Sequence, residues 1–258
     1  MSAEQPVRAW TTAGFAPVDE PIGQALAADS WLVVDGRVLA WQRHQLRFAD
    51  AVAQAGGDRL DAMAAVRGAV GLAPAEGRWS PRVDLTPAGI RLRIRPAPAP
   101  SDRVDVVTAS RDPRREPLRK GPDLEALQAL VEEESARAGR DVEPILCTDG
   151  LVAEGARSAL LWWRDDVLHV PADRIPHMAS VTAAVIEEVA SLDGVEVRRV
   201  AARPDELEGA EVWLANALRG IRGVAAWHDG PEVAAPARVD AWRARLEQLR
   251  TPVTAGRS

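Results

Sequence analysis

The chain has almost no lysine. Lys120 is the only one among 258 residues, and every other basic side chain is arginine or histidine. An arginine guanidinium stays protonated and forms no imine, whereas a desolvated lysine amine can form one. A chain that otherwise uses arginine and keeps one lysine is therefore expected to need an amine there. The alternative is a compositional remnant, because an alanine- and arginine-rich sequence must place its last lysine somewhere.

The sequence also has no tyrosine and a single cysteine, Cys147. A mechanism that needs a phenol from this chain is excluded, and so are an intramolecular disulfide and a cysteine-cluster metal site, so we expect no metal. No apolar stretch approaches the roughly 20 residues of a membrane span. Residues 1–20 lack the basic start and apolar run of a secretory signal. These absences predict a cytoplasmic protein without a membrane partner.

Composition is otherwise that of a soluble globular enzyme, with 47% hydrophobic and 27% charged residues. The formal net charge is -6, and the arginines alternate with Asp and Glu instead of forming a basic block. That balance argues against nucleic acid as a partner. The length suits one large domain or two small ones.

The first half predicts a mixed α+β domain. Asp35-Gly36 between two apolar runs predicts a tight hairpin, since both turn positions must accept a positive φ. Apolar spacing predicts helices over 42–54 and 58–72 and strands over 83–85, 90–94 and 104–108. Residues 1–28 give only weak signals.

Residues 110–119 are charged, contain two prolines and are the best candidate for a linker. We therefore expect a small domain over 1–112 and a larger β-rich α/β domain over 113–258 that contains Lys120. The second domain is expected to have helices over 123–138, 182–192 and 238–249, the last with Leu246 and Leu249 on one face. Its expected strands are 145–148, 151–153, 159–163, 167–170, 195–200, 211–215 and 221–227.

Five motifs occur in an order that resembles the class IV pyridoxal-phosphate enzymes. This group includes the branched-chain aminotransferases, D-amino acid aminotransferase and 4-amino-4-deoxychorismate lyase. The matching segments are His44-Gln45-Leu46-Arg47-Phe48, Lys120 before a helix, Leu151-Val152-Ala153-Glu154-Gly155 with Ser158, Met178-Ala179-Ser180-Val181-Thr182, and Trp213-Leu214-Ala215-Asn216-Ala217-Leu218-Arg219-Gly220-Ile221. The resemblance covers about residues 30–230 and implies the two-domain α/β (α+β) fold of that family.

The resemblance also implies a role for each matching residue toward pyridoxal 5'-phosphate. Lys120 would be the Schiff-base lysine and the proton carrier. Glu154 would face the pyridine nitrogen, where an anion keeps that nitrogen protonated and strengthens the ring as an electron sink. The phosphate would be bound by Arg47, by the helix start at Val181 and Thr182, and by Asn216-Ala217. Each has a plainer interpretation: Glu154 as a solvated turn residue, Arg47 as an exposed helix arginine, Asn216 as part of a strand-end turn.

The chain departs from the family pattern at several positions. Alanine occupies positions 159, 179 and 183, where the family commonly has Asn, Pro and Arg. A tyrosine follows the lysine closely in branched-chain aminotransferases, and this chain has none. Pro96-Ala97-Pro98-Ala99-Pro100 replaces a stretch that is often rich in Arg and Gly in the lyases. Cofactor binding therefore transfers better than substrate identity.

We expect an enzyme of the 4-amino-4-deoxychorismate lyase type that releases pyruvate and 4-aminobenzoate. The match at Asn216-Ala217-Leu218 and the lack of tyrosine favour this branch. The first alternative is a class IV amino-acid aminotransferase, of the branched-chain or D-amino acid type. The second is a degenerate homologue that binds the cofactor without turnover. The expected partner is a small amino-acid-like substrate, and the resemblance implies a homodimer.

Overall fold

The computed structural model describes residues 6–20 and 22–253, which form two compact units. The first unit takes its residues from 1–99, 119–122 and 247–258, and the second consists of 100–118 and 123–246. These limits do not coincide with the expected boundary between residues 112 and 113. Lys120, which we expected in the second domain, belongs to the first unit.

The first unit is built on an eight-stranded sheet in which all pairs are antiparallel. The order is β16-β5-β4-β6-β7-β1-β2, and β3 also pairs with β6. The strands are β1 (Arg8–Thr11), β2 (Gly14–Pro17), β3 (Ala27–Ser30), β4 (Val33–Val34), β5 (Arg37–Val38), β6 (Arg78–Thr86), β7 (Gly89–Pro96) and β16 (Thr251–Pro252).

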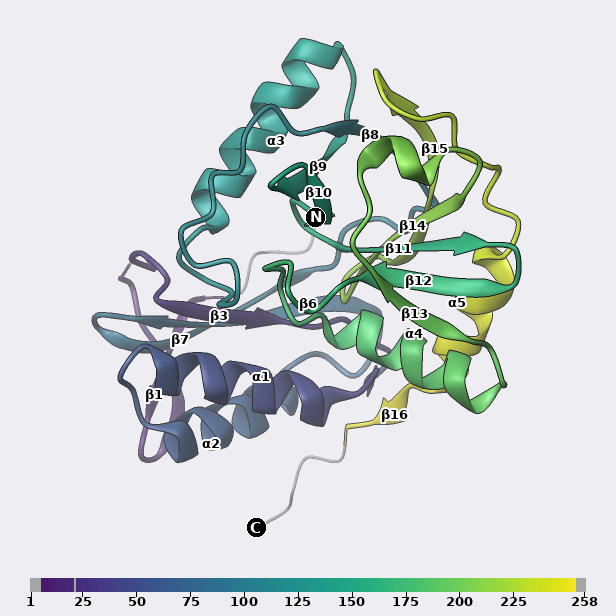
Figure 1. Cartoon of the computed structure of the whole chain (residues 1–258). Helices are drawn as coiled ribbons and strands as arrows, with labels where there is room; N and C mark the ends of the chain where they lie inside the picture. The colour runs from purple at the N-terminus through teal and green to yellow at the C-terminus, as the bar shows by residue number, and fades with distance from the viewer. Residues whose placement is uncertain (1–5, 21, 254–258) are drawn as a thin grey trace. The chain divides into compact units, whose positions relative to one another are not determined.

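Two helices, α1 (Trp41–Gln54) and α2 (Arg59–Val70), lie side by side against one face of this sheet (Figure 1). They share a core with the strands that contains Trp31, Phe48, Val83 and Leu92. On β6 and β7 the apolar residues alternate with Arg82, Asp84 and the arginines of β7, so charged side chains occupy the opposite face. The helix periodicity and the strand alternation seen in the sequence thus produce a two-layer unit.

The segment that contains Lys120 is attached to β3. The N–H of Ala28 donates to the carbonyl oxygen of Lys120 at 2.7 Å. Gly121 follows with a φ of 143°, and a Cβ there would meet the Ala27 backbone at 2.7 Å. The chain therefore needs glycine next to Lys120, because a side chain would collide with the strand.

The second unit is built on a mixed sheet of order β10-β9-β8-β15-β14-β11-β12-β13. Its strands are β8 (Arg103–Thr108), β9 (Glu143–Thr148), β10 (Leu151–Gly155), β11 (Ala159–Arg164), β12 (Val167–Pro171), β13 (Val197–Val200), β14 (Glu211–Asn216) and β15 (Gly220–His228). Helix α3 (Leu124–Ala138) connects the parallel pair β8 and β9, and α4 (Val181–Leu192) connects the parallel pair β12 and β13. A short 3-10 helix spans Pro204–Leu207, and α5 (Val239–Gln248) is the last helix.

The structure confirms most expected elements and corrects others. Asp35 and Gly36 have φ angles of 47° and 67°, as the predicted hairpin requires. The strands β1, β2 and β3 arise in or next to the region that gave weak signals, and β16 was not expected. Leu249 is 41% exposed whereas Leu246 is buried, so the two do not share a packed face.

Two kinds of feature are absent from residues 6–20 and 22–253. No helix there is long and apolar enough to span a lipid bilayer. The same residues contain no group of three or more His, Cys, Asp or Glu side chains that could hold a metal ion.

We predict that Gly121→Ala destabilises the protein more than Gly14→Ala. Both glycines have a positive φ, and strained backbone of this kind costs about 1–3 kcal/mol for another residue. Gly14 has no atom within 4 Å of an added Cβ, whereas Gly121 faces the Ala27 backbone. Urea unfolding of the two variants measures the difference. Equal losses would contradict a tight contact between the lysine segment and β3.

Candidate functional site

The centre of the polar site in the first unit is Asp29, a fully buried carboxylate on β3. Arg47 on α1 binds it with two nitrogens, Nε to Oδ2 at 2.7 Å and Nη2 to Oδ1 at 2.8 Å. His44, one turn earlier, places Nδ1 2.9 Å from Oδ1. Arg47 and His44 therefore share one face of α1, as their spacing predicted, and that face is directed at Asp29.

The charges of this cluster are set by burial and by these contacts. Burial favours the neutral acid, but the charge of Arg47 and the hydrogen bonds from Arg47 and His44 hold the pKa of Asp29 well below its usual range. Burial lowers the pKa of His44 despite the attraction of Asp29. Asp29 is therefore ionised and His44 neutral at pH 7, which leaves Arg47 as the counter-ion.

Lys120 lies beside this cluster. Its Nζ donates to Ser30 Oγ at 3.1 Å, and Ser30 directly follows Asp29 on β3. Burial lowers the pKa of the half-buried Lys120 amine to about 8, and the charge of Arg47 acts in the same direction. The carboxylates of Asp29 and Asp84 oppose the shift without cancelling it. A substantial fraction of the amine is therefore neutral near physiological pH, as nucleophilic attack requires.

Further arginines lie in register with Ser30. Ser30 pairs with Arg82 on β6, and Arg82 pairs with Arg93 on β7. Arg82 binds the buried Asp84 through Nε at 2.8 Å, and Arg93 is 3.6 Å from its other oxygen. Burial lowers the pKa of Arg93, opposed by Asp84 and reinforced by Arg82 and Arg95. Positive charge thus exceeds negative charge in this row next to Lys120.

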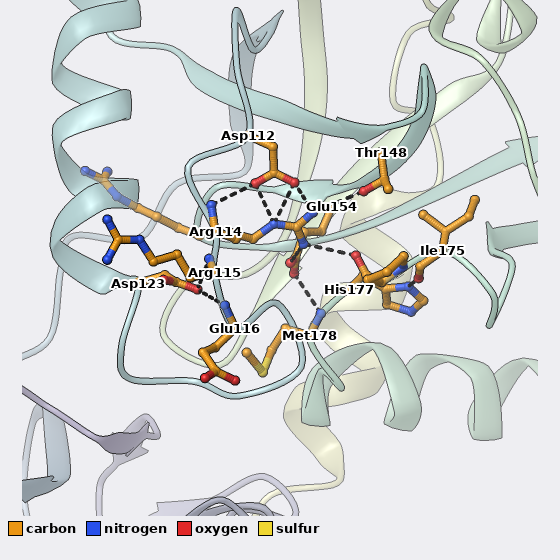
Figure 2. A network of polar contacts seen from close by, with 12 residues as sticks. Asp112, Arg114, Arg115, Glu116, Asp123, Thr148, Glu154, Ile175, His177 and Met178 are labelled. Carbon is orange, nitrogen blue, oxygen red and sulfur yellow. Dashed lines mark hydrogen bonds and ion pairs between the residues drawn. The ribbon is translucent and has the colours of Figure 1, made fainter. Parts of the chain in front are cut away.

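Glu154 is the central acid of the second unit. It lies on β10 at a register shift between Val152 and Glu154, a β-bulge that changes the direction of the strand. Its Oε1 accepts from Arg114 Nη1, and its Oε2 accepts from the Met178 N–H at 3.2 Å (Figure 2). Burial raises the pKa of Glu154 to about 7, although Arg114 and the Met178 N–H oppose the shift. Glu154 is therefore a buried carboxyl, not a solvated turn residue.

Val181 and Thr182 form the first turn of α4, and both are buried. Ser180 is the N-cap residue, and its side chain accepts from the Ala183 N–H at 3.2 Å. The first intrahelical bond to the cap runs from the Ala184 N–H to the Ser180 carbonyl. The earlier N–H groups of a helix have no intrahelical partner and favour anions.

Asn216 ends β14, and its side chain is used within the protein. Its Nδ2 donates to Ser158 Oγ at 2.9 Å, and its Oδ1 accepts from the N–H groups of Leu218 and Arg219 at 3.1 and 2.9 Å. These contacts fix the turn that contains Ala217. The plainer interpretation of Asn216 as a strand-end turn residue therefore describes its side chain. The expected role of the Asn216-Ala217 backbone toward a phosphate stays a prediction.

The predicted residues fall into two groups, each described within its own unit. Lys120 and Arg47 belong to the first unit, whereas the second contains Glu154, Val181, Thr182, Asn216 and Ala217. Sequence reasoning missed Asp29, Ser30 and Arg114. A signal existed for the first two, since Asp29-Ser30 interrupts an apolar run and a buried acid needs a cationic partner. No sequence signal pointed to Arg114, because it lies among the other charged residues of the expected linker.

Comparison with known families decides the family of this chain. The model of the amino-transferase class IV family matches residues 26–227. The chain belongs to this family. The match includes every residue proposed for the site, and it confirms the resemblance drawn from the five motifs.

Solved structures agree with this assignment at the level of the fold. A branched-chain aminotransferase from the archaeon Thermoproteus uzoniensis is 15% identical with a TM-score of 0.78, over 98% of this chain and 100% of that chain. A hypothetical aminotransferase from Mycobacterium tuberculosis in its PLP-bound form is 18% identical with a TM-score of 0.75, over 94% and 98%. A candidate 4-amino-4-deoxychorismate lyase from Legionella pneumophila is 17% identical with a TM-score of 0.70, over 86% and 90%. No curated protein matches the chain.

We predict that the Lys120 amine titrates near pH 8 in the folded protein. Reductive methylation with ¹³C-formaldehyde labels the primary amines, and the Lys120→Arg variant identifies the lysine resonance. In urea the midpoint should return to about 10.4, the value of a solvated lysine. A folded-state midpoint near 10 would show that Arg47 and burial do not affect this amine.

Proposed function

We propose that this class IV family member is a pyridoxal-phosphate-dependent enzyme in which Lys120 binds the cofactor covalently. One observation carries the proposal. The only lysine of the chain donates to Ser30 Oγ and has a pKa lowered to about 8 by burial and by the charge of Arg47. Family membership and the PLP-bound relatives support pyridoxal 5'-phosphate as the cofactor.

The residues present fit that group. Lys120 offers an amine for the aldehyde, and the buried carboxyl of Glu154 offers an anion for the ring nitrogen. The helix start at Val181 and Thr182 offers backbone N–H groups for the phosphate. Arg47 and the backbone at Asn216-Ala217 remain candidates for the same phosphate, although Arg47 already binds Asp29 with two nitrogens.

The cofactor supplies an electron sink for the charge that develops when a substrate loses the proton on its Cα. Lys120 Nζ accepts that proton as the neutral amine. Ser30 Oγ orients Nζ by accepting one of its hydrogens. Glu154 holds the ring nitrogen in its protonated form. Asp29 fixes Arg47 and His44, so the positive charge that adds to the effect of burial on the pKa of the amine stays in place.

We propose 4-amino-4-deoxychorismate as the substrate, with pyruvate and 4-aminobenzoate as the products. The row of Ser30, Arg82 and Arg93 supports a substrate with two carboxylates over a branched-chain amino acid. Nε of Arg93 is buried without a hydrogen-bond partner among the described residues. Forked guanidinium donors suit carboxylates. A homodimer and a cytoplasmic location belong to the proposal as well, and they rest on the resemblance and on composition alone.

The second candidate is a class IV amino-acid aminotransferase. The fold of the branched-chain aminotransferase from Thermoproteus uzoniensis, with a TM-score of 0.78, favours it. The arginine row is compatible with this reaction if one substrate is a dicarboxylic amino or oxo acid. The same Lys120 would then move a proton from the substrate to the cofactor.

We predict that borohydride fixes the cofactor on Lys120 in the loaded protein. Lys120 and the amino terminus are the primary amines of this chain, and peptide mapping should place the adduct on the segment after Arg119. Lys120→Arg keeps the charge and should lose both the adduct and turnover, since a guanidinium forms no imine. Normal turnover by this variant would make Lys120 a compositional remnant.

We predict that the protein converts aminodeoxychorismate to 4-aminobenzoate without an amino acceptor. Product analysis by chromatography with and without a 2-oxo acid measures this. An aminotransferase would instead require the 2-oxo acid and release a new amino acid. A protein that binds the cofactor but changes no member of an amino-acid panel would be a non-catalytic homologue.

A further inference from the structure

Arg114 is a buried arginine in a segment without helix or strand. Its side chain is 3% exposed, although the segment 110–119 is rich in charged residues. Figure 2 shows the guanidinium between two acids. It binds Asp112 through Nε at 2.9 Å and Nη2 at 2.6 Å, and it donates to Glu154 Oε1 through Nη1. Burying this cation requires the partners that it has on both sides.

The same network reaches the segment before α4. Nη1 of Arg114 also donates to the Pro176 carbonyl at 3.1 Å, and the Met178 N–H donates to Glu154 Oε2 at 3.2 Å. Met178 lies two residues before Ser180, the N-cap of α4. Arg114 and Glu154 therefore attach the start of α4 to β10. The proposed partner of the ring nitrogen and the proposed phosphate-binding helix start are linked through this one ion pair.

The charge of the cluster is also informative. Asp112 and Glu154 together carry two negative charges and Arg114 one positive charge, so the ionised cluster has a net charge of -1. A simple Arg–Glu pair would be neutral and would attract a cation only weakly. Asp112 therefore leaves the carboxylate of Glu154 able to attract a further positive group.

Arg114 also increases the fraction of Glu154 that is ionised at neutral pH. Burial disfavours the ionised form of Glu154 and the charge of Asp112 adds to that effect, whereas Arg114 is the largest opposing influence. Without the guanidinium the buried acid would be mostly protonated at pH 7. A protonated acid could not hold a pyridinium by charge.

We propose that Arg114 is a positioning residue that favours the ionised form of Glu154 and holds its direction, and that Asp112 balances the charge of Arg114 so that the ionised cluster retains one negative charge for the protonated nitrogen of the cofactor. The inference rests on the proposed function. It assigns a role in cofactor binding to two residues of a segment that would otherwise be a linker.

The test uses Arg114→Met, which keeps most of the side-chain stem and removes the charge, and Arg114→Lys, which restores a charge without the fork. Arg115→Met is the matched control, because Arg115 is the next residue and its side chain is exposed. In cofactor-free protein, the carboxyl ¹³C resonance of Glu154, assigned with Glu154→Gln, gives its titration midpoint. We expect the midpoint to rise in Arg114→Met, by about one unit or more, and to stay unchanged in Arg115→Met.

Cofactor affinity supplies the second readout. We expect Arg114→Met to weaken pyridoxal phosphate binding roughly tenfold or more, as the loss of a charge-assisted contact predicts. Binding of the 1-deaza analogue, which lacks the ring nitrogen, should change little. Arg114→Lys should recover part of the affinity, and Asp112→Asn should show the same selectivity for the nitrogen-containing ligand.

Three results would overturn the inference. A purely structural arginine would lower the melting temperature and weaken both ligands equally, with the Glu154 midpoint unchanged. If wild type binds pyridoxal phosphate and Arg114→Met binds both ligands as well as wild type does, the role proposed for Arg114 is wrong and the proposed function is unaffected. If wild type binds neither ligand, the proposed function fails and this inference falls with it.

Discussion

The buried carboxylate of Asp29 is the constraint on which the first unit depends. An ionised group without water needs partners, and removing one partner of such a pair costs about 3–5 kcal/mol. Arg47 and His44 supply those partners from α1, so the requirement joins the helix layer to β3. Ser30 is the next residue on the strand and holds Lys120. The surroundings of the Lys120 amine are therefore determined by the residues that neutralise the nearby carboxylate of Asp29.

In the second unit, too, buried carboxylates are neutralised by arginine side chains. Arg114 binds Asp112 and Glu154, and Arg222 binds Glu143 and Ser158, so each guanidinium serves two acceptors at once. An ammonium is a compact charge and cannot span two acids in a fixed plane. The arginine-rich composition thus has a structural use, and it is compatible with the lack of a basic surface block.

Local signals in the sequence predicted the local structure. The helices α1 and α4 and the hairpin at Asp35-Gly36 follow from periodicity and turn chemistry. The contacts that make the site are not local. Arg114 and Glu154 are 40 residues apart, and Lys120 and Ser30 are 90 apart. No periodic pattern in the sequence indicates which acidic side chain an arginine will bind. The motifs pointed to Glu154 and Lys120 but not to their partners, and Lys120 contacts the first unit through Ala28 and Ser30, which lie about 90 residues earlier in the chain.

The partners of the neighbouring acids also bear on the charge that position 120 can carry. The two acids that influence its charge are already engaged, Asp29 by Arg47 and Asp84 by Arg82. A guanidinium there would stay charged at any physiological pH and would add a cation to a row of cations. An amine whose pKa is lowered to about 8 can lose its proton and avoid that repulsion. Electrostatics within the first unit therefore favours an amine at this position independently of imine chemistry. Burial and the same positive surroundings are what lower the pKa of the Lys120 amine.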